Sequence, residues 1–386
     1  MRFKVAIAGA GIGGLTAAAY LARAGHEVEI FDKFDAPSPV GSGLVVQPVG
    51  QAVLDDLDAL DHALQLGAKI TSMAGFEVDH GRQVLNVSYG KGSGLAIHRA
   101  SLFEVLLTAA RSAGAHLNTK AEVSGFDAQH VIARTGRHGP FDLIINASGA
   151  NSDLSPLRSR ALPYGAIWGT VPWPKDTEMP TNELLQRYQK ANHMIGLLPI
   201  GSLPDRDTSL AAVFWSMPAD GYDSWRGAPL DAWKAEACAL WPDMAPFLAQ
   251  ITSHDQMTMA RYSHGTLLNP VRGRVVHLGD AAHRASPQLG QGANMALLDA
   301  AALNSALTDP DIDVALLNYR RARRAHVWFY QLLSASFTPQ YQSDSTVLPW
   351  LRDRLLFPLS QVPPAPYLLT RLVRGDILPP LGSLRR

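Results

Sequence analysis

The sequence has one cysteine, no long apolar run and no excess charge of either sign. Because Cys238 stands alone among 386 residues, no disulfide can form within the chain, which favours a reducing compartment. No run of about 18 apolar residues suggests a transmembrane helix, and the N-terminal MRFKVAIAGAG lacks a signal-peptide pattern. The formal net charge of +0 gives no reason to expect nucleic acid as a partner. We therefore expect a cytoplasmic protein without membrane contact; its oligomeric state stays open.

Metal-binding patterns are also missing. The 13 histidines are scattered without ligand spacing such as HExxH, so no metal site is predicted. Cys238 lies in the apolar run AEACALW, which favours a small packed residue over a nucleophile. The hydrophobic fraction of 47% and the charged fraction of 18% are typical of a globular protein, and the length suits two domains.

The N-terminal residues follow the order strand, glycine turn, helix, strand. Residues 3–8 form a short apolar run, residues 15–24 are rich in alanine and leucine, and Gly25 ends that helical pattern. Residues 28–31 are predicted to form a second strand. This order within about 30 residues predicts a βαβ unit.

The turn in this unit reads GAGIGG. Gly9 permits the tight bend, Gly11 lets the backbone approach a pyrophosphate, and Gly14 lets the helix pack against the strand. The helix N-terminus offers N–H groups to phosphate, and Asp32 stands where a carboxylate accepts hydrogen bonds from a ribose. The predicted contacts are Gly9, Gly11, Ile12, Gly13, Gly14, Asp32 and Lys33. The turn by itself does not separate FAD from NAD, since both carry an adenosine ribose.

A second glycine-rich pattern lies far along the chain, where residues 273–294 read GRVVHLGDAAHRASPQLGQGAN. A strand at 275–278 ends in Gly-Asp, which places the Asp280 carboxylate where it can bind hydroxyl groups. A loop without bulky side chains then leads into a helix whose first N–H groups stabilise nearby negative charge. The candidate ligand-binding residues of this segment are Gly279, Asp280, Pro287, Gly290, Gly292, Ala293 and Asn294.

Together the two patterns resemble the flavin hydroxylases related to p-hydroxybenzoate hydroxylase, the group A flavoprotein monooxygenases. The resemblance is carried by GAGIGG, by GD after a strand, by AAH, and by PxxGQGxN at the start of a helix. It implies that Asp280 contacts the ribityl chain of non-covalently bound FAD and that the helix beginning at Gly292 faces the N1–C2=O edge of reduced flavin. A cap of a helix or turn is the alternative for Asp280, and His283 is interpreted as a packed or hydrogen-bonded residue.

Two shorter segments are also similar to that family. In AIHRASLFEVLL an arginine precedes a helix, which implies that Arg99 reaches the FAD phosphates or ribityl, with a surface salt bridge as the alternative. In VGSGLVVQPVGQAVL a glycine loop is implied to lie beside the flavin ring, which adds Gly43 and Gln47.

The chain departs from the family at one place. Relatives usually have DLVIGADGxxS, and residues 142–152 of this chain read DLIINASGANS. Ser148 therefore replaces an aspartate that the family links to the handling of FAD and NAD(P)H. FAD binding stays expected, whereas the reductant is in question.

The resemblance implies an FAD-dependent monooxygenase that hydroxylates a small aromatic or heteroaromatic substrate with O2 and NAD(P)H through a flavin C4a-hydroperoxide. Because the cofactor carries the chemistry, no catalytic base is assigned, and the loop of Pro287 and Gly290 is expected beside the flavin. Aromatic and histidine candidates for the substrate side are Tyr188, His193, Trp215, Tyr222 and Tyr262.

Two alternatives stay open. The first is another flavin oxidoreductase on the same fold, such as an oxidase, reductase or halogenase; the halogenase motif WxWxIP is not present. The second is a redox-silent protein that holds FAD. A disulfide reductase is disfavoured, since it needs a second GxGxxG unit and usually a pair of redox cysteines.

The predicted fold is α/β, with a Rossmann-like FAD-binding domain, a second and mostly antiparallel sheet that contacts substrate, and a helical C-terminal segment. An alternating strand is expected at 210–215, and helices are expected at 293–307 and 315–336. The run RRARR at 320–324 is interpreted as a solvated basic face. The expected domains are 1–70, 96–160 and 264–345 for FAD, 71–95 and 161–263 for substrate, and 346–386 for the C-terminal helices.

Overall fold

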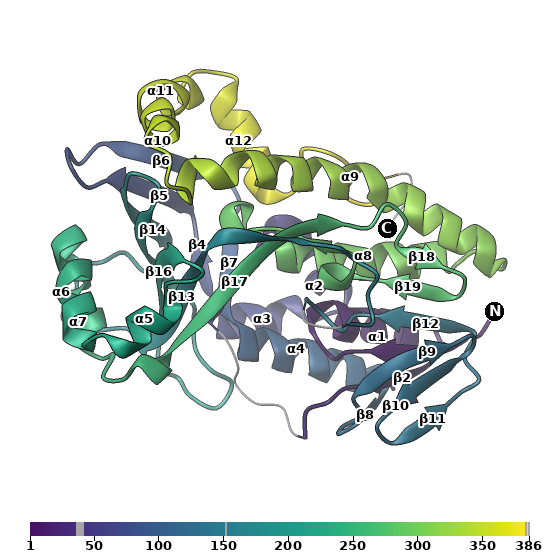
Figure 1. The fold of residues 1–386 in the computed structure, drawn as a ribbon. Helices are drawn as coiled ribbons and strands as arrows, with labels where there is room; N and C mark the ends of the chain where they lie inside the picture. Colours follow the sequence, from purple (N-terminus) through teal and green to yellow (C-terminus); the bar gives the residue numbers. More distant parts are fainter. Residues whose placement is uncertain (36–41, 151–152, 383, 385–386) are drawn as a thin grey trace.

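The computed structural model describes residues 1–35, 42–150, 153–382 and 384, and two large sheets organise it (Figure 1). The first sheet has six strands, in the order β18 (Val271–Arg272), β19 (Val275–His277), β12 (Leu143–Asn146), β1 (Lys4–Ala8), β2 (Glu27–Phe31) and β8 (His116–Asn118). All neighbouring strands are parallel except β18, which pairs antiparallel at the edge. This is the predicted βαβ arrangement, extended by strands from much later in the sequence.

Helices cover one face of this sheet and a small sheet covers the other. Helices α1 (Ile12–Arg23), α4 (Arg99–Ser112) and α8 (Gly292–Ala306) share one apolar core with the inward side chains of β1, β2, β12 and β19. On the opposite face, Ala6, Phe31 and Ile144 pack against the sheet of β9 (Val123–Asp127), β10 (His130–Ala133) and β11 (Gly136–His138). Because both faces are covered, the central strands β1 and β12 are mostly apolar along their length.

The second large sheet is mostly antiparallel, as predicted. Its order is β20 (His283–Arg284), β17 (Met257–Thr266), β13 (Arg160–Pro172), β16 (Leu210–Pro218), β15 (His193–Pro199), β14 (Glu183–Gln189), β5 (Ser72–Glu77) and β6 (Gln83–Ser88). Strands β14 and β5 pair parallel. Helices α5 (Tyr222–Gly227), α6 (Leu230–Leu240) and α7 (Ala245–Leu248) pack on the outer face, at the left in Figure 1.

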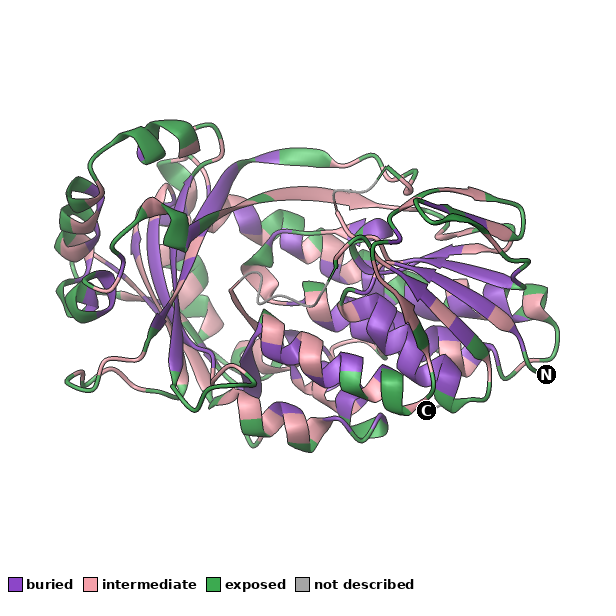
Figure 2. Ribbon diagram, turned by 90° about the horizontal axis from the view of Figure 1, so that it is seen from below, coloured by how far each residue is buried: buried purple, intermediate pink, exposed green. Residues whose placement is uncertain are grey.

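The expectation that residues 210–215 alternate between core and solvent is wrong. Residues 210–217 of β16 are all buried, because the strand lies between two cores. Val213 and Trp215 face the core with the outer helices, whereas Ala212 and Phe214 face the interior of the molecule. Figure 2 shows this sheet buried along its strands, with exposed residues on the peripheral helices.

A three-stranded sheet joins the two halves. It consists of β3 (Gly43–Val46), β7 (Gly94–His98) and β4 (Ala68–Ile70). Val46 and Ile97 belong to the core of the first sheet, and Val45 and Ala96 to the core beside the second. Successive residues of β3 and of β7 therefore pack into the two cores in alternation, which connects the two halves. The domain limits stay a prediction.

The C-terminal part is helical, as predicted. Helix α9 (Ile312–Tyr341) spans 30 residues, more than expected from the sequence, and crosses the molecule beside both sheets (Figure 1). Its N-terminus is capped by the Asp311 side chain, which accepts from the N–H groups of Asp313 and Val314. The short helices α10 (Val347–Leu351), α11 (Phe357–Ser360) and α12 (Ala365–Arg374) follow. No helix in the described part of the chain is long and apolar enough to span a membrane.

Candidate functional site

The carboxyl ends of four parallel strands bring the predicted motifs together. In the strand register Ala8 lies beside both Phe31 and Asn146, and Asn146 lies beside His277. The glycine turn, Asp32, Ser148 and the Gly279–Asp280 pair therefore share one edge of the sheet. The chain order reverses between β1 and β12, and such a switch point creates a crevice for ligands.

The three glycines of the turn have different tasks. Gly9 has φ +105°, and a Cβ there would lie 2.5 Å from the Ala147 carbonyl oxygen. A Cβ on Gly14 would lie 1.9 Å from the Gly9 carbonyl oxygen, so close packing of helix on strand requires glycine. At Gly11, by contrast, a Cβ would meet no described atom within 4 Å. Protein packing thus explains Gly9 and Gly14, whereas the space at Gly11 is open to a ligand.

The Asp32 carboxylate holds this turn from the neighbouring strand. Its Oδ2 accepts from the Ala10 N–H at 2.6 Å, and its Oδ1 accepts from the Phe34 N–H at 3.2 Å. The side chain is half-buried, and Lys33 beside it is exposed. Helix α1 begins next to this carboxylate with Gly11 at its N-cap, where none of the described side chains caps the helix. Backbone N–H groups and a carboxylate therefore lie together at the crevice.

The Gly279–Asp280 pair lies in a second turn at this edge of the sheet. Gly279 has φ +56°, and a Cβ there would lie 3.1 Å from the Ala296 Cβ of α8. Asp280 follows with an exposed side chain. His283, two positions beyond the turn Gly279–Ala281, is buried and bonds through Nε2 to Asp299 Oδ2 at 2.7 Å, as predicted for a packed, hydrogen-bonded histidine.

The loop before α8 lies next to β3. Gly290 has φ +60°, and Asn294 connects this loop to the neighbouring strand: its Nδ2 donates to Gly290 O at 2.9 Å and to Val45 O at 3.1 Å. Its Oδ1 accepts from the Gln47 N–H at 2.8 Å. The side chain of Asn294 is thus fully engaged with backbone. Pro287 and Gly292 are exposed, Ala293 is half-buried, and a Cβ on Gly292 would meet no described atom within 4 Å.

Gln47 lies beneath this loop. The side-chain amide of Gln47 is buried, and its Nε2 lies 3.1 Å from the position that a Cβ on Gly290 would take. The same amide lies next to the Tyr89 hydroxyl. Neither polar group makes a hydrogen bond of normal geometry within the described residues. Gly43 is required by packing, since a Cβ there would lie 2.1 Å from Ile200 Cγ2. Val40 and Gly41 of the glycine loop lie outside the described residues.

Arg99 is the first residue of α4, whose N-cap is His98. The His98 Nδ1 accepts from the Ala100 N–H at 3.1 Å, and the Arg99 N–H donates to Ser42 O at 3.1 Å. The Arg99 side chain is exposed, and its charge acts on the Tyr262 hydroxyl. Arg99 therefore stands between the glycine loop and the second sheet.

Ser148 is part of a polar chain that the sequence reasoning missed. Its Oγ donates to Asn146 Oδ1 at 2.5 Å, and Asn146 Nδ2 bonds to His277 Nδ1 at 3.0 Å. Burial lowers the pKa of His277 to about 4, with Arg272 contributing, so the ring is neutral and accepts through Nδ1. A signal existed in the sequence: the family pattern DLVIGADG has glycine where this chain has Asn146.

The structure separates the five substrate-side candidates. Trp215, His193 and Tyr222 lie on the outer face of the second sheet, among the residues packed against α5 and α6. Tyr188 is fully buried and donates to Gln186 Oε1 at 2.8 Å. Tyr188 packs beside Tyr341 and under the Arg352 guanidinium.

Tyr262 is the exception, and two further aromatic residues accompany it. The Trp168 Nε1–H donates to the Tyr262 hydroxyl oxygen at 3.0 Å, and Trp168 stacks on Phe214 with centroids 4.3 Å apart and planes at 24°. Burial raises the pKa of Tyr262 to about 12, so its hydroxyl keeps its proton. We call Trp168, Phe214 and Tyr262 the aromatic wall; sequence reasoning missed its first two members.

A family model described as an FAD binding domain matches residues 2–162 and 164–330. The chain belongs to this family of FAD-binding flavoproteins. Among its curated relatives, a probable 2-heptyl-3-hydroxy-4(1H)-quinolone synthase of Rhodococcus erythropolis is 27% identical over 98% of this chain and 97% of its own length. The 6-hydroxynicotinate 3-monooxygenase of Bordetella bronchiseptica is 26% identical over 83% of this chain and 88% of its own length.

Solved structures share the fold of this flavoprotein. A mutant of 2-methyl-3-hydroxypyridine-5-carboxylic acid oxygenase superposes with a TM-score of 0.81 at 23% identity, covering 99% of this chain and 98% of that one. A variant of HpxO from Klebsiella pneumoniae, solved with FAD, gives 0.78 at 22% identity over 99% and 100% of the two chains. The predicted fold class, FAD as cofactor and the assignment to the FAD-dependent aromatic monooxygenases are confirmed.

Proposed function

We propose that FAD lies across the strand-end crevice with its pyrophosphate at Gly11 and the N-terminus of α1. Asp32 then binds the adenosine ribose, and Asp280 and Arg99 bind the ribityl and phosphate groups. The residues fit such a cofactor: the space at Gly11 is open, α1 begins without a side-chain cap, and Asp280 is exposed at the end of β19. A helix N-terminus next to open space stabilises phosphate charge.

The flavin ring, in this proposal, lies beside the loop of Pro287 and Gly290 and the N-terminus of α8 at Gly292. Bound FAD supplies the transfer of one oxygen atom from O2, after reduction by NAD(P)H. The protein positions the ring, excludes water and stabilises charge near the first N–H groups of α8. No protein side chain is proposed as a base.

We further propose that the aromatic wall binds a flat nitrogen heteroaromatic substrate with an oxygen substituent on its ring. Three observations support this. Trp168 and Phe214 face the interior and offer stacking area, and the charge of Arg99 acts on Tyr262. The Tyr262 hydroxyl accepts from Trp168 and donates to none of the described residues. The similar proteins are named as a probable hydroxyquinolone synthase, a 6-hydroxynicotinate monooxygenase and a hydroxypyridine-carboxylic acid oxygenase. A protonated Tyr262 suits a substrate oxygen as hydrogen-bond acceptor.

The observation that carries the function is the family match over most of the chain together with the four strand ends at one crevice. To test it, oxidation of NADH and NADPH is followed with a panel of quinolones, hydroxypyridines, indoles and phenols, and products are analysed after reaction under 18O2. We expect coenzyme oxidation stimulated by a heteroaromatic compound and one 18O atom in its product. Stimulation without label in any product would exclude hydroxylation.

Tyr262→Phe separates substrate binding from cofactor binding. This variant keeps the ring in the wall and removes the donor, so KM should rise on the order of 10-fold, the cost of one hydrogen bond of about 1.4 kcal/mol, while FAD content stays unchanged. If the variant lost FAD as well as substrate affinity, Tyr262 would instead lie at the cofactor.

We also propose the domain limits stated above and, on the single cysteine, a cytoplasmic location.

A further inference from the structure

Asp299 of α8 is a buried carboxylate that the proposed chemistry does not use. It is 1% exposed, and its Oδ2 accepts from the Gly279 N–H at 2.9 Å and bonds to His283 Nε2 at 2.7 Å. Its Oδ1 accepts from Arg323 Nε at 2.8 Å. The interpretation of residues 320–324 as a solvated face is therefore wrong for Arg323, which is 3% exposed. One carboxylate thus links the turn that carries Asp280 to α9.

The same cluster holds the C-terminal tail, defined here as residues 372–382. Arg323 Nη1 donates to Pro380 O at 2.5 Å, His326 Nε2 donates to Gly375 O at 2.9 Å, and the Tyr330 hydroxyl donates to Leu372 O at 3.0 Å. All three acceptors are backbone carbonyls, so these hydrogen bonds depend on the backbone conformation of the tail and not on its side chains.

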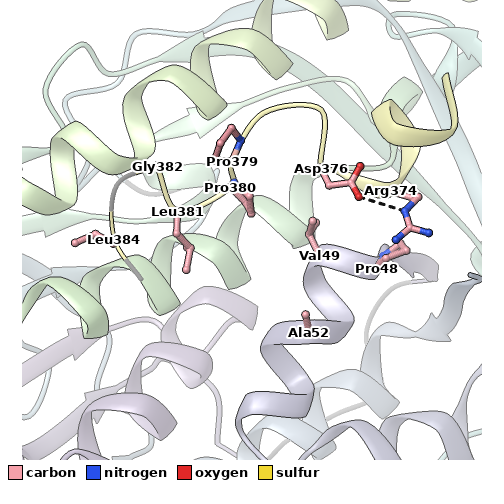
Figure 3. A pocket seen from close by; sticks show the side chains of 10 residues that line it. All are labelled: Pro48, Val49, Ala52, Arg374, Asp376, Pro379, Pro380, Leu381, Gly382 and Leu384. Atoms are coloured by element: carbon pink, nitrogen blue, oxygen red, sulfur yellow. Dashed lines mark hydrogen bonds and ion pairs between the residues drawn. The ribbon is translucent and has the colours of Figure 1, made fainter. Parts of the chain in front are cut away.

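The second FAD-facing loop also contacts the tail. Gln291, which directly precedes α8, donates from Nε2 to Val373 O at 2.8 Å. Gly375 has φ +88°, and a Cβ there would lie 2.4 Å from Val49 Cγ2 of α2 (Pro48–Asp56). Figure 3 shows the tail arching over α2, with Pro379, Pro380 and Leu381 above Val49 and Ala52 around a pocket. This pocket lies under the tail, away from the glycine turn, and we assign it no ligand.

We propose that Asp299 is a positioning residue that couples FAD binding to docking of the C-terminal tail. The inference rests on the proposed placement of FAD at the strand-end crevice. Asp299 fixes the Gly279–Asp280 turn through the Gly279 N–H, and it orients Arg323 for the tail. Gln291 provides the second connection, from the loop beside the flavin. Because both FAD-facing segments and the tail share these contacts, each stabilises the other.

Thermodynamic reciprocity makes the coupling testable from either end. If tail docking tightens FAD binding by a given factor, FAD binding favours the docked tail by the same factor. The tail is not among the residues proposed to contact FAD, so direct shielding does not account for protection of its amides. Asp299 touches neither the proposed cofactor nor the aromatic wall, so it is no catalytic residue.

The test is hydrogen exchange of peptides covering residues 372–382 in the full-length protein, with FAD bound and after its removal. We expect FAD to slow exchange of these amides on the order of 10-fold, within the usual range of coupling between sites. In Asp299→Asn this protection should disappear, the dissociation constant of FAD should rise by a similar factor, and the visible circular dichroism of bound flavin should change.

Asp311→Asn is the matched control, because Asp311 caps α9 but makes none of the contacts described above to the turn or the tail. Because asparagine also caps helices, this variant should leave stability, tail protection and flavin dichroism close to those of the wild type. A chain that ends after Ile377, and so lacks Pro380, should bind FAD more weakly even if Asp299→Asn does not fold. Unchanged tail exchange in the wild-type protein on FAD binding overturns the coupling while leaving the proposed function intact. A protein that binds no FAD overturns both.

Discussion

At the scale of single residues, the glycine turn contains positions that packing restricts to glycine and a position that packing leaves free. A Cβ added to Gly14 would lie 1.9 Å from the Gly9 carbonyl oxygen, whereas a Cβ added to Gly11 would meet no described atom within 4 Å. A side chain at either position disturbs the protein, but for different reasons. A Cβ at Gly14 conflicts with the fold itself, whereas Gly11 is the position proposed here to face the cofactor.

We therefore expect Gly11→Val to yield a folded protein without FAD, since a β-branched side chain fills the space of the pyrophosphate. Gly14→Val should lose several kcal/mol of unfolding free energy, because helix and strand must separate. Flavin absorbance and far-UV circular dichroism of the two purified variants check this. A yellow, folded Gly11→Val protein would mean that the phosphates bind elsewhere.

Asn146 and Ser148 stand where the family pattern DLVIGADG has glycine and aspartate. The Ser148 hydroxyl donates to Asn146 Oδ1, and the amide of Asn146 reaches neutral His277. An aspartate at 148 next to that amide oxygen would bring two acceptors together. In this chain the serine supplies the hydrogen-bond donor that the Asn146 amide oxygen accepts.

Ser148→Asp alone should lower the unfolding free energy by about 1–3 kcal/mol, because an acceptor loses its donor. The double variant Asn146→Gly with Ser148→Asp restores the family pattern and should recover part of that loss. We expect slow reduction of wild-type FAD by NAD(P)H without substrate, and faster reduction in the double variant. Urea unfolding and anaerobic stopped-flow bleaching measure the two effects. If dithionite bleaches the flavin but neither coenzyme does under any condition, the NAD(P)H assignment is wrong.

At the scale of elements, sequence patterns identified the parts whose determinants are local. The strand, turn and helix at residues 4–23 follow from apolar runs and glycines, and α8 begins where the PxxGQGxN pattern indicates. Burial of Arg323 was not predictable in this way, because its partner Asp299 lies on another helix. Likewise, β16 is buried on both faces only because α5–α7 cover its outer side. Long-range packing decides both cases.

Two buried histidines on different elements predict how stability depends on pH. Burial lowers the pKa of His277 at the end of β19 to about 4 and, with Arg323, that of His326 on α9 to about 4. Both values lie below the unfolded value of 6.5, so the unfolded chain binds protons first as pH falls. Stability is complete above that value and is lost as pH falls from it toward 4.

Between pH 7 and pH 5 each histidine should reduce the unfolding free energy by about 2 kcal/mol. Urea unfolding at the two pH values measures the total loss. His277→Gln keeps a polar side chain of similar length and should remove about half of the part due to these two histidines. If the variant loses as much stability as the wild type over this range, His277 is not buried in its neutral form.

At the scale of the whole molecule, the proposed FAD contacts come from segments far apart in the sequence. The glycine turn and Asp32 lie near the N-terminus, Arg99 begins α4, and Asp280 and Gly292 follow near the end of the first sheet. The β3–β7–β4 sheet connects these segments to the second sheet through alternate residues. A ligand that binds all of them should stabilise the molecule as a unit.

We predict that FAD is bound without a covalent link and raises the melting temperature according to its occupancy. Cys238 lies on α6, among the residues packed on the outer face of the second sheet, and acid precipitation should release all flavin.

For a ligand that binds only the folded state, free FAD at about 100 times its dissociation constant adds about 2.7 kcal/mol to the unfolding free energy. A titration of the deflavinated protein with FAD, followed by thermal unfolding, should therefore give a melting temperature that rises with the logarithm of free FAD once the site is filled. AMP, which carries the ribose and only one phosphate, should give a smaller rise, because it reaches Asp32 and the glycine turn but not Asp280 or α8. A melting temperature that FAD does not move, in a protein that nonetheless turns yellow, would show that FAD binds the folded and unfolded chains equally, and the crevice would then not be its site.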